Sequence, residues 1–140
     1  YEDVGITNTF YLWIERLSVR GVMGGYVCGG VEEPCGVENR PYFRPFSPAT
    51  RGQLSKIVSN TAGYNDEPPG QTFADVPTNN TFYREIGRLS SRGIMGGYPC
   101  GGPGEPCDSE SRPYFRPNAN VTRGQASKIV ANTFFPACQP

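Results

Sequence analysis

The sequence predicts a mainly α-helical protein made of two tandem modules, each with two principal helices joined by a long cysteine-containing loop with little β structure. The main observation is an internal repeat. Shifted by 72 residues, the chain is identical to itself at 40 of the 68 overlapping positions without a gap. Residues 1–61 form the first copy, 73–140 the second copy with its tail, and 62–72, which are rich in turn formers, the linker.

The first helix of each copy is predicted from an apolar stripe at helical spacing. Thr9 is the expected N-cap in copy one, and Gly21 and Gly93 are placed to end the two helices. The stripe consists of Phe10, Trp13, Ile14 and Leu17 in copy one, and of Phe82, Ile86 and Leu89 in copy two.

The second helix of each copy is predicted to begin at a capping box. In Thr50–Gln53 and again in Thr122–Gln125, a Thr hydroxyl and a Gln side chain three residues later satisfy orphan helix N–H groups. Apolar residues at helical spacing follow each box.

Several motifs recur in the same order in both copies and together resemble the S-layer homology module. They are YEDV at 1–4 against FADV at 73–76, TFYLWIERLSVRGVMGGY at 9–26 against TFYREIGRLSSRGIMGGY at 81–98, RPYFRP at 40–45 and 112–117, and TRGQ at 50–53 and 122–125. The resemblance implies a mostly helical, extracytoplasmic prokaryotic surface protein. Modules of that family commonly come in threes around a pseudo-threefold axis, and the grooves between them bind acidic cell-wall polysaccharide.

Three features depart from the family pattern. Gln53 and Gln125 stand where the family often has Glu, the loops at 26–43 and 98–115 are longer than usual, and two copies are present. A third module would then be lost, dispensable or supplied by another chain.

Composition excludes several functions. With 13 basic and 13 acidic residues, the chain lacks the excess positive charge that nucleic acid binding requires. No apolar run approaches the roughly 20 residues that cross a bilayer. The absence of His and of any nucleophile motif argues against an enzyme, and no cofactor or metal site is expected.

Four of the five cysteines are paired by the repeat. Cys28 and Cys35 recur as Cys100 and Cys107 in turn-rich loops, which favours one disulfide in each loop. Zinc binding and reduced thiols are the alternatives, although the six-residue spacing and the absence of His disfavour zinc. Disulfides indicate an oxidising, extracellular location.

The basic residues recur more faithfully than the acidic ones, and most are Arg. A guanidinium can grip the carboxylate of an anionic sugar, or it can form internal ion pairs that tie loops to helix ends. By resemblance to the family, the candidate glycan-binding residues are Arg51, Arg123, Asp3, Asp75, Gly25, Tyr26, Gly97 and Tyr98. Each also has a structural interpretation: the Asp residues as caps of the first helix, the Gly residues in turns and the Tyr residues in the core.

Positions without a counterpart suggest contacts with other molecules. Leu12 and Trp13 become Arg84 and Glu85 in copy two, which indicates either an intermolecular contact or local packing against the linker. The tail adds apolar Phe134 and Phe135, and Cys138 is either a free thiol or an intermolecular link.

Two functions fit these observations. The first is a non-catalytic extracellular subunit of a homopolymeric surface filament, tube or lattice, built by head-to-tail contacts between repeats. The alternative is a cell-wall anchor that binds an acidic wall polysaccharide.

Overall fold

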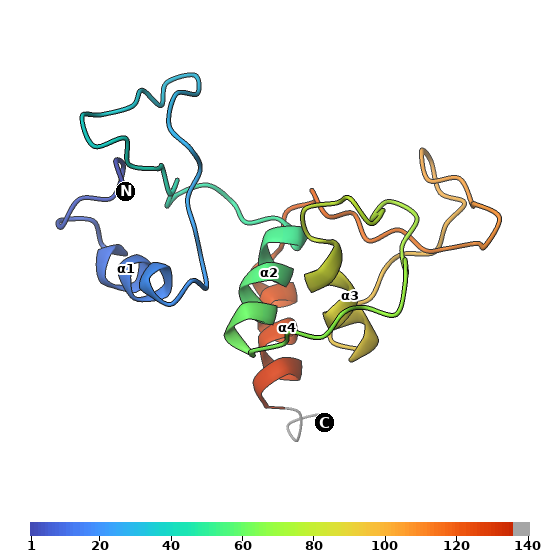
Figure 1. The fold of residues 1–140 in the computed structure, drawn as a ribbon. Coiled ribbons are helices and arrows are strands. Elements are labelled where there is room, and N and C mark those ends of the chain that lie inside the picture. Colours follow the sequence, from blue (N-terminus) through green and yellow to red (C-terminus); the bar gives the residue numbers. More distant parts are fainter. Residues whose placement is uncertain (136–140) are drawn as a thin grey trace. The chain divides into compact units, whose positions relative to one another are not determined.

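The computed structural model describes residues 1–135 and is mainly helical, as predicted. In this part of the chain the helices are α1 (Tyr11–Val19), α2 (Arg51–Thr61), α3 (Tyr83–Ser91) and α4 (Arg123–Phe134), shown in Figure 1. Its β structure consists of isolated bridges in the loops and at the start of α2. The chain forms two compact units, Tyr1–Ser47 (unit 1) and Pro48–Pro140 (unit 2).

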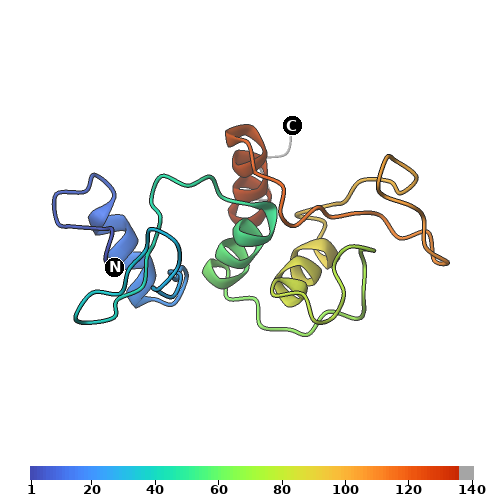
Figure 2. The same cartoon turned by 90° about the horizontal axis from the view of Figure 1, so that it is seen from above.

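The packing units are offset from the sequence repeats. Helix α2 belongs to copy one by sequence, yet it lies in unit 2 together with α3 and α4 of copy two. It packs against both of those helices, as the two views of Figures 1 and 2 show. The second helix of one copy therefore completes the core of the next copy.

Unit 2 has a contiguous hydrophobic core. The helix residues in it are Val58 from α2, Ile86 and Leu89 from α3, and Ile129 from α4. The connecting segments contribute Phe73, Val76, Ile94, Met95 and Phe115.

Both capping boxes form as predicted. The Thr50 and Thr122 side chains accept hydrogen bonds from the backbone N–H groups of Gln53 and Gln125, and each Gln side chain accepts a bond from the Thr backbone N–H in return. By contrast, the prediction that Thr9 caps α1 is wrong. The N-cap is Phe10, whose N–H donates to the Asn8 side chain at 2.8 Å, so an Asx turn precedes the helix.

The expected glycine stops are also confirmed. Gly21 and Gly93 follow α1 and α3 with φ values of +66° and +67°, a left-handed conformation that costs glycine little.

Unit 1 has a smaller core made mainly of Val4, Ile14 and Val22. Of the predicted α1 stripe only Ile14 is buried, while Phe10 and Trp13 are 44% and 62% exposed. At the positions that both copies share, Ile14 and Ile86 are both buried, whereas Leu17 is only partly buried and its counterpart Leu89, on the helix against which α2 packs, is fully buried. The apolar stripe is thus more completely covered in copy two than in copy one.

Candidate functional site

The most elaborate arrangement of predicted site residues is the contact between α2 and copy two, which we call the α2 seam. Its centre is Arg51, which is 7% exposed. Its Nε donates to the Phe115 carbonyl at 2.8 Å, and its Nη2 donates to the Gly96 carbonyl at 2.7 Å. The guanidinium also lies over the Phe115 ring at 4.4 Å and the Tyr98 ring at 5.3 Å.

Burial is the main influence on the protonation of Arg51. Removal from water lowers the pKa of its guanidinium from the ordinary value, and the nearby Tyr98 and Asp75 oppose this effect. The positive charge of the Arg51 guanidinium is stabilised by the dipoles of the two carbonyl groups and by the faces of the two aromatic rings. Arg51 therefore acts as an internal tie between copies.

The backbone at the start of α2 completes the seam. Arg51 N donates to the Ala119 carbonyl and Gly52 N to the Pro117 carbonyl, both at 2.8 Å, which satisfies two of the orphan N–H groups of the helix. A Cβ atom on Gly52 would lie 2.4 Å from Cδ2 of Phe82, so this close approach requires glycine. One turn later, Ser55 Oγ donates to the Arg51 carbonyl at 2.8 Å and lies 3.4 Å from the Met95 sulfur.

The two candidate Asp residues hold the strand-like segment before each second helix. Asp75 accepts from Phe115 N at 2.7 Å and Arg116 N at 2.6 Å, and Asp3 makes the same two bonds to Phe43 N and Arg44 N. They do not cap the first helix, as one of the structural interpretations proposed. Instead they orient the backbone that carries the Phe115 or Phe43 carbonyl.

The Gly-Gly-Tyr turns pack tightly in both copies. A Cβ on Gly97 would lie 2.5 Å from the Phe73 ring, and one on Gly25 would lie 2.6 Å from the Tyr1 ring. Tyr98 pairs with Tyr114 through backbone bonds of 2.8 Å in both directions, and Tyr26 pairs with Tyr42 in the same way.

The structure brings together only part of the candidate glycan-binding set. The α2 seam in unit 2 brings together Arg51, Gly97 and Tyr98. Asp75 lies near them and binds the backbone of the Phe115 segment. Asp3, Gly25 and Tyr26 form the corresponding arrangement in unit 1. Arg123 is exposed on α4, and its guanidinium has no hydrogen-bond or ion-pair partner within residues 1–135.

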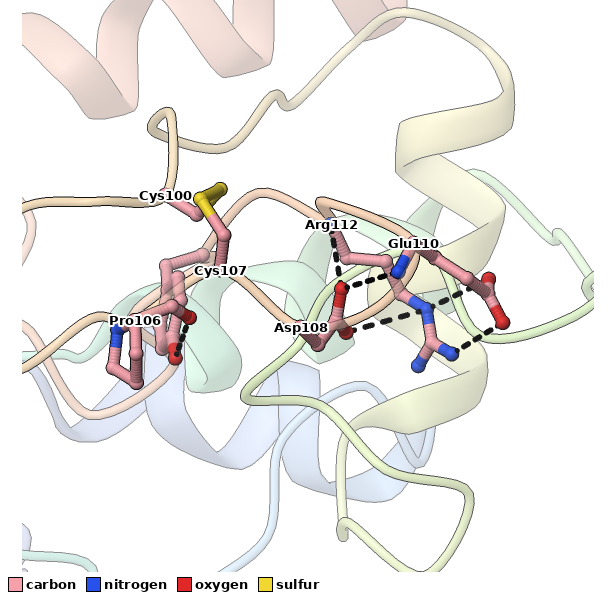
Figure 3. The surroundings of a disulfide bond; sticks show 7 residues. Cys100, Pro106, Cys107, Asp108, Glu110 and Arg112 are labelled. Carbon is pink, nitrogen blue, oxygen red and sulfur yellow. Dashed lines mark hydrogen bonds and ion pairs between the residues drawn. A yellow bond between two sulfur atoms is a disulfide. The ribbon is translucent and has the colours of Figure 1, made fainter.

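Each long loop is closed by the predicted disulfide. Cys28 bonds Cys35 and Cys100 bonds Cys107, the latter shown in Figure 3. The loops are also tied to the following segment, because Tyr42 and Tyr114 donate through their hydroxyls to the Pro34 and Pro106 carbonyls at 3.0 Å.

A repeated ion pair clamps each loop. Arg44 binds Glu33 through Nε at 2.6 Å and Nη2 at 2.7 Å, and Arg116 binds Glu105 at 2.7 and 2.9 Å. These hydrogen bonds hold the pKa of each Glu carboxyl below its ordinary value. Each Arg also lies over a tyrosine ring, at 3.9 Å from Tyr26 and 4.0 Å from Tyr98. Arg44 and Arg116 therefore form internal ion pairs, which is one of the two roles that the sequence suggests for the repeated arginines.

Two charge clusters in unit 2 involve residues that the repeat does not match. Arg112 contacts both Asp108 and Glu110, as Figure 3 shows, where copy one has Gly36 in place of Asp108. The linker reaches α3 through Asp66, whose carboxylate binds Arg92 at 2.7 Å and whose carbonyl accepts from Arg88 at 2.6 Å. The recurrence of Glu110 and Arg112 as Glu38 and Arg40, which also form an ion pair at 3.4 Å, is the sequence signal for part of the first cluster.

The apolar residues proposed for intermolecular contacts are exposed. Leu12 and Trp13 are 60% and 62% exposed, and Phe134 and Phe135 are 39% and 60% exposed. In unit 1, Leu12 and Trp13 are therefore not covered by local packing. Cys138 lies outside the described residues.

Comparison with family models gives a match over part of the chain. The family model of the S-layer homology domain matches residues 72–127, which supports the family suggested by the sequence motifs. No curated protein matches the chain. S-layer homology domains are non-catalytic anchoring or structural modules that bind cell-wall polymers, so the match indicates a cell-surface or cell-wall associated protein.

Residues 1–135 contain neither a membrane-spanning helix nor a metal-binding cluster. None of the helices in this range is long and apolar enough to cross a bilayer. No group of three or more Cys, Asp or Glu side chains among the same residues is arranged to hold a metal ion.

Proposed function

We propose that this chain is a non-catalytic extracellular structural protein that self-assembles into a cell-surface polymer through its S-layer homology-like repeats. One observation carries the proposal. The face of α2 that is buried against copy two recurs on α4, where it is exposed. We call these sets the α2 face (Arg51, Gly52, Ser55, Val58) and the α4 face (Arg123, Gly124, Ser127, Val130).

The α2 face and the α4 face carry the same four residue types, so they differ in exposure and not in composition. Val58 is 2% exposed and Val130 is 39% exposed. Gly52 faces Phe82, whereas a Cβ atom on the corresponding Gly124 would meet nothing within 4 Å. A surface that is built to be buried, and that is left open, favours association. Because the open face differs from the surface that would receive it, such association is head to tail and gives rings or open filaments.

Assembly is tested by light scattering and negative-stain electron microscopy over a concentration series. The expected result is ordered particles or filaments whose mass rises with concentration in the absence of glycan. A protein that stays monomeric at millimolar concentration would refute the proposal.

The second candidate function is anchoring to an acidic cell-wall polysaccharide. It is supported by the family match and by Arg123, a cation exposed on α4. Arg51 is already bonded to two carbonyl groups, so Arg123 is the stronger glycan candidate of this pair. Binding of purified wall polysaccharide by the wild type, and its loss in Arg123→Ala, would favour anchoring.

A further inference from the structure

The α2 seam consists of two halves, and each half recurs in the chain without its partner. The first half is the α4 face described above. The second half is the surface of copy two that receives α2, and its counterpart in unit 1 is made of Phe10, Leu17, Met23, Gly24 and Phe43, which we call the acceptor surface of unit 1. The counterparts that receive α2 are Phe82, Leu89, Met95, Gly96 and Phe115.

The acceptor surface of unit 1 is already formed. Val22 N donates to the Leu17 carbonyl at 3.0 Å, and its counterpart Ile94 N donates to Leu89 at 2.9 Å. The Tyr26–Tyr42 pair and the Asp3 bonds to the Phe43 segment reproduce their copy-two equivalents within 0.1 Å. Thus the backbone that presents the Gly24 and Phe43 carbonyls adopts the receiving arrangement within unit 1 itself.

The side chains of this surface are less covered than their counterparts. Leu89 and Phe115 are fully buried, whereas Leu17 and Phe43 are only partly buried. Met95 is buried and Met23 is partly exposed, and the Phe10 ring, in the place of the ring that contacts Gly52, is 44% exposed. Each of these side chains has the greater exposure expected when no helix equivalent to α2 covers it.

We propose that α4 of one copy docks on the acceptor surface of unit 1 of a second copy and repeats the α2 seam between molecules. In this contact the Arg123 guanidinium donates to the Gly24 and Phe43 carbonyls of the second copy, as Arg51 donates to those of Gly96 and Phe115. Gly124 lies against Phe10. The inference rests on the proposed function and names the surfaces that would carry the assembly.

A sequence difference between the two seams fits an intermolecular contact. The buried Ser59 of α2 is Ala131 on α4, which removes a hydroxyl that would be costly to bury. This change makes the centre of the α4 face more apolar than that of the α2 face, as the buried centre of an interface between chains favours. The exchange of Arg84 and Glu85 for Leu12 and Trp13 lies outside the seam, because Arg84 binds Glu67 of the linker at 3.1 Å.

The proposal is tested with one variant on each surface. Gly124→Leu fills the space that Phe10 of the second copy would occupy, and we expect its own fold to accept the side chain because nothing lies within 4 Å of the Cβ position. Phe10→Arg places a charge on the acceptor surface at an exposed ring; Met23→Arg is the second choice if Phe10→Arg fails to fold. Folding is checked by circular dichroism, and each variant is also made with Cys138→Ser so that a thiol cross-link is not mistaken for docking.

Analytical ultracentrifugation should show that either variant alone is monomeric, with association weakened about 100-fold or more relative to wild type. A mixture of the two retains one intact α4 face and one intact acceptor surface, so it should form a 1:1 dimer that grows no further. If wild type assembles but both variants assemble equally well, or their mixture gives no dimer, the docking inference is wrong and the proposed function stands. If wild type itself stays monomeric, both fail.

Discussion

Arg51 and Arg123 provide a matched pair for measuring the internal seam. They occupy the same position of the same Thr-Arg-Gly-Gln motif, but Arg51 is buried and bonded to two carbonyls, whereas Arg123 is exposed. Arg51→Ala removes two hydrogen bonds from a charged donor, each worth about 1.5–3 kcal/mol, and leaves the Phe115 carbonyl without this donor beside a buried ring. Allowing for water that enters the space, we expect Arg51→Ala to lower the free energy of unfolding of unit 2 by about 2–4 kcal/mol.

The assay is urea denaturation at dilute protein, where assembly does not contribute to stability. Far-ultraviolet circular dichroism reports mainly on α2, α3 and α4, which all lie in unit 2. Fluorescence of Trp13, the single tryptophan, reports on unit 1 and should be unchanged. Arg123→Ala is the control and should stay within about 0.5 kcal/mol of wild type.

Unfolding of Arg51→Ala and Arg123→Ala at the same urea concentration would refute the role of Arg51 as a tie. Arg51→Lys refines the test, because an ammonium group keeps the charge but lacks the planar fork that reaches both carbonyls. It should recover part of the stability and not all of it.

Three further predictions concern the stability of the monomer. Gly124→Ala should stabilise α4 by about 0.5–1 kcal/mol, whereas Gly52→Ala, whose Cβ would meet Phe82 at 2.4 Å, should destabilise unit 2; equal effects in urea melts would contradict the packing difference. Ser59→Ala should raise the unfolding free energy by about 1 kcal/mol, since its hydroxyl is buried without a partner among the described residues; a lower melting temperature would contradict this. The Glu33 and Glu105 carboxylates have lowered pKa values, so their clamps should stabilise the loops above the ordinary pKa of 4.5 and lose that contribution as the pH falls through the lowered values; Glu33→Gln and Glu105→Gln should flatten this acid-side loss in thermal melts.

Local features of the fold were predictable from sequence because they depend on neighbouring residues. The capping boxes at Thr50 and Thr122, the stops at Gly21 and Gly93 and the two loop disulfides each follow from a motif within a few residues. The prediction of a Thr9 cap was wrong for a local reason: the Tyr11 N–H, which a Thr9 cap could have bound, donates to the Asn8 carbonyl at 3.0 Å, and the helix begins one residue later.

The partners of each helix were not predictable, because identical residues occupy different environments. Arg51 and Arg123 share one motif, and so do Val58 and Val130, yet only the first of each pair is buried. Periodicity shows that a face is apolar and does not identify the segment that covers it. The carbonyl groups that accept from Arg51 could not be predicted either. Every residue carries a carbonyl, and only the fold determines that those of Gly96 and Phe115 are the acceptors.

The offset between repeat and packing unit also affects how the chain reaches its native state. During synthesis, which proceeds from the N-terminus, the α2 segment is made before α3 and the Phe115 segment that receive it. During that interval its buried face is open to the copy-two segment of any neighbouring molecule. Slow synthesis or export at high local concentration should therefore favour molecules that exchange α2, a route to domain-swapped species whose seam is chemically identical to the native one.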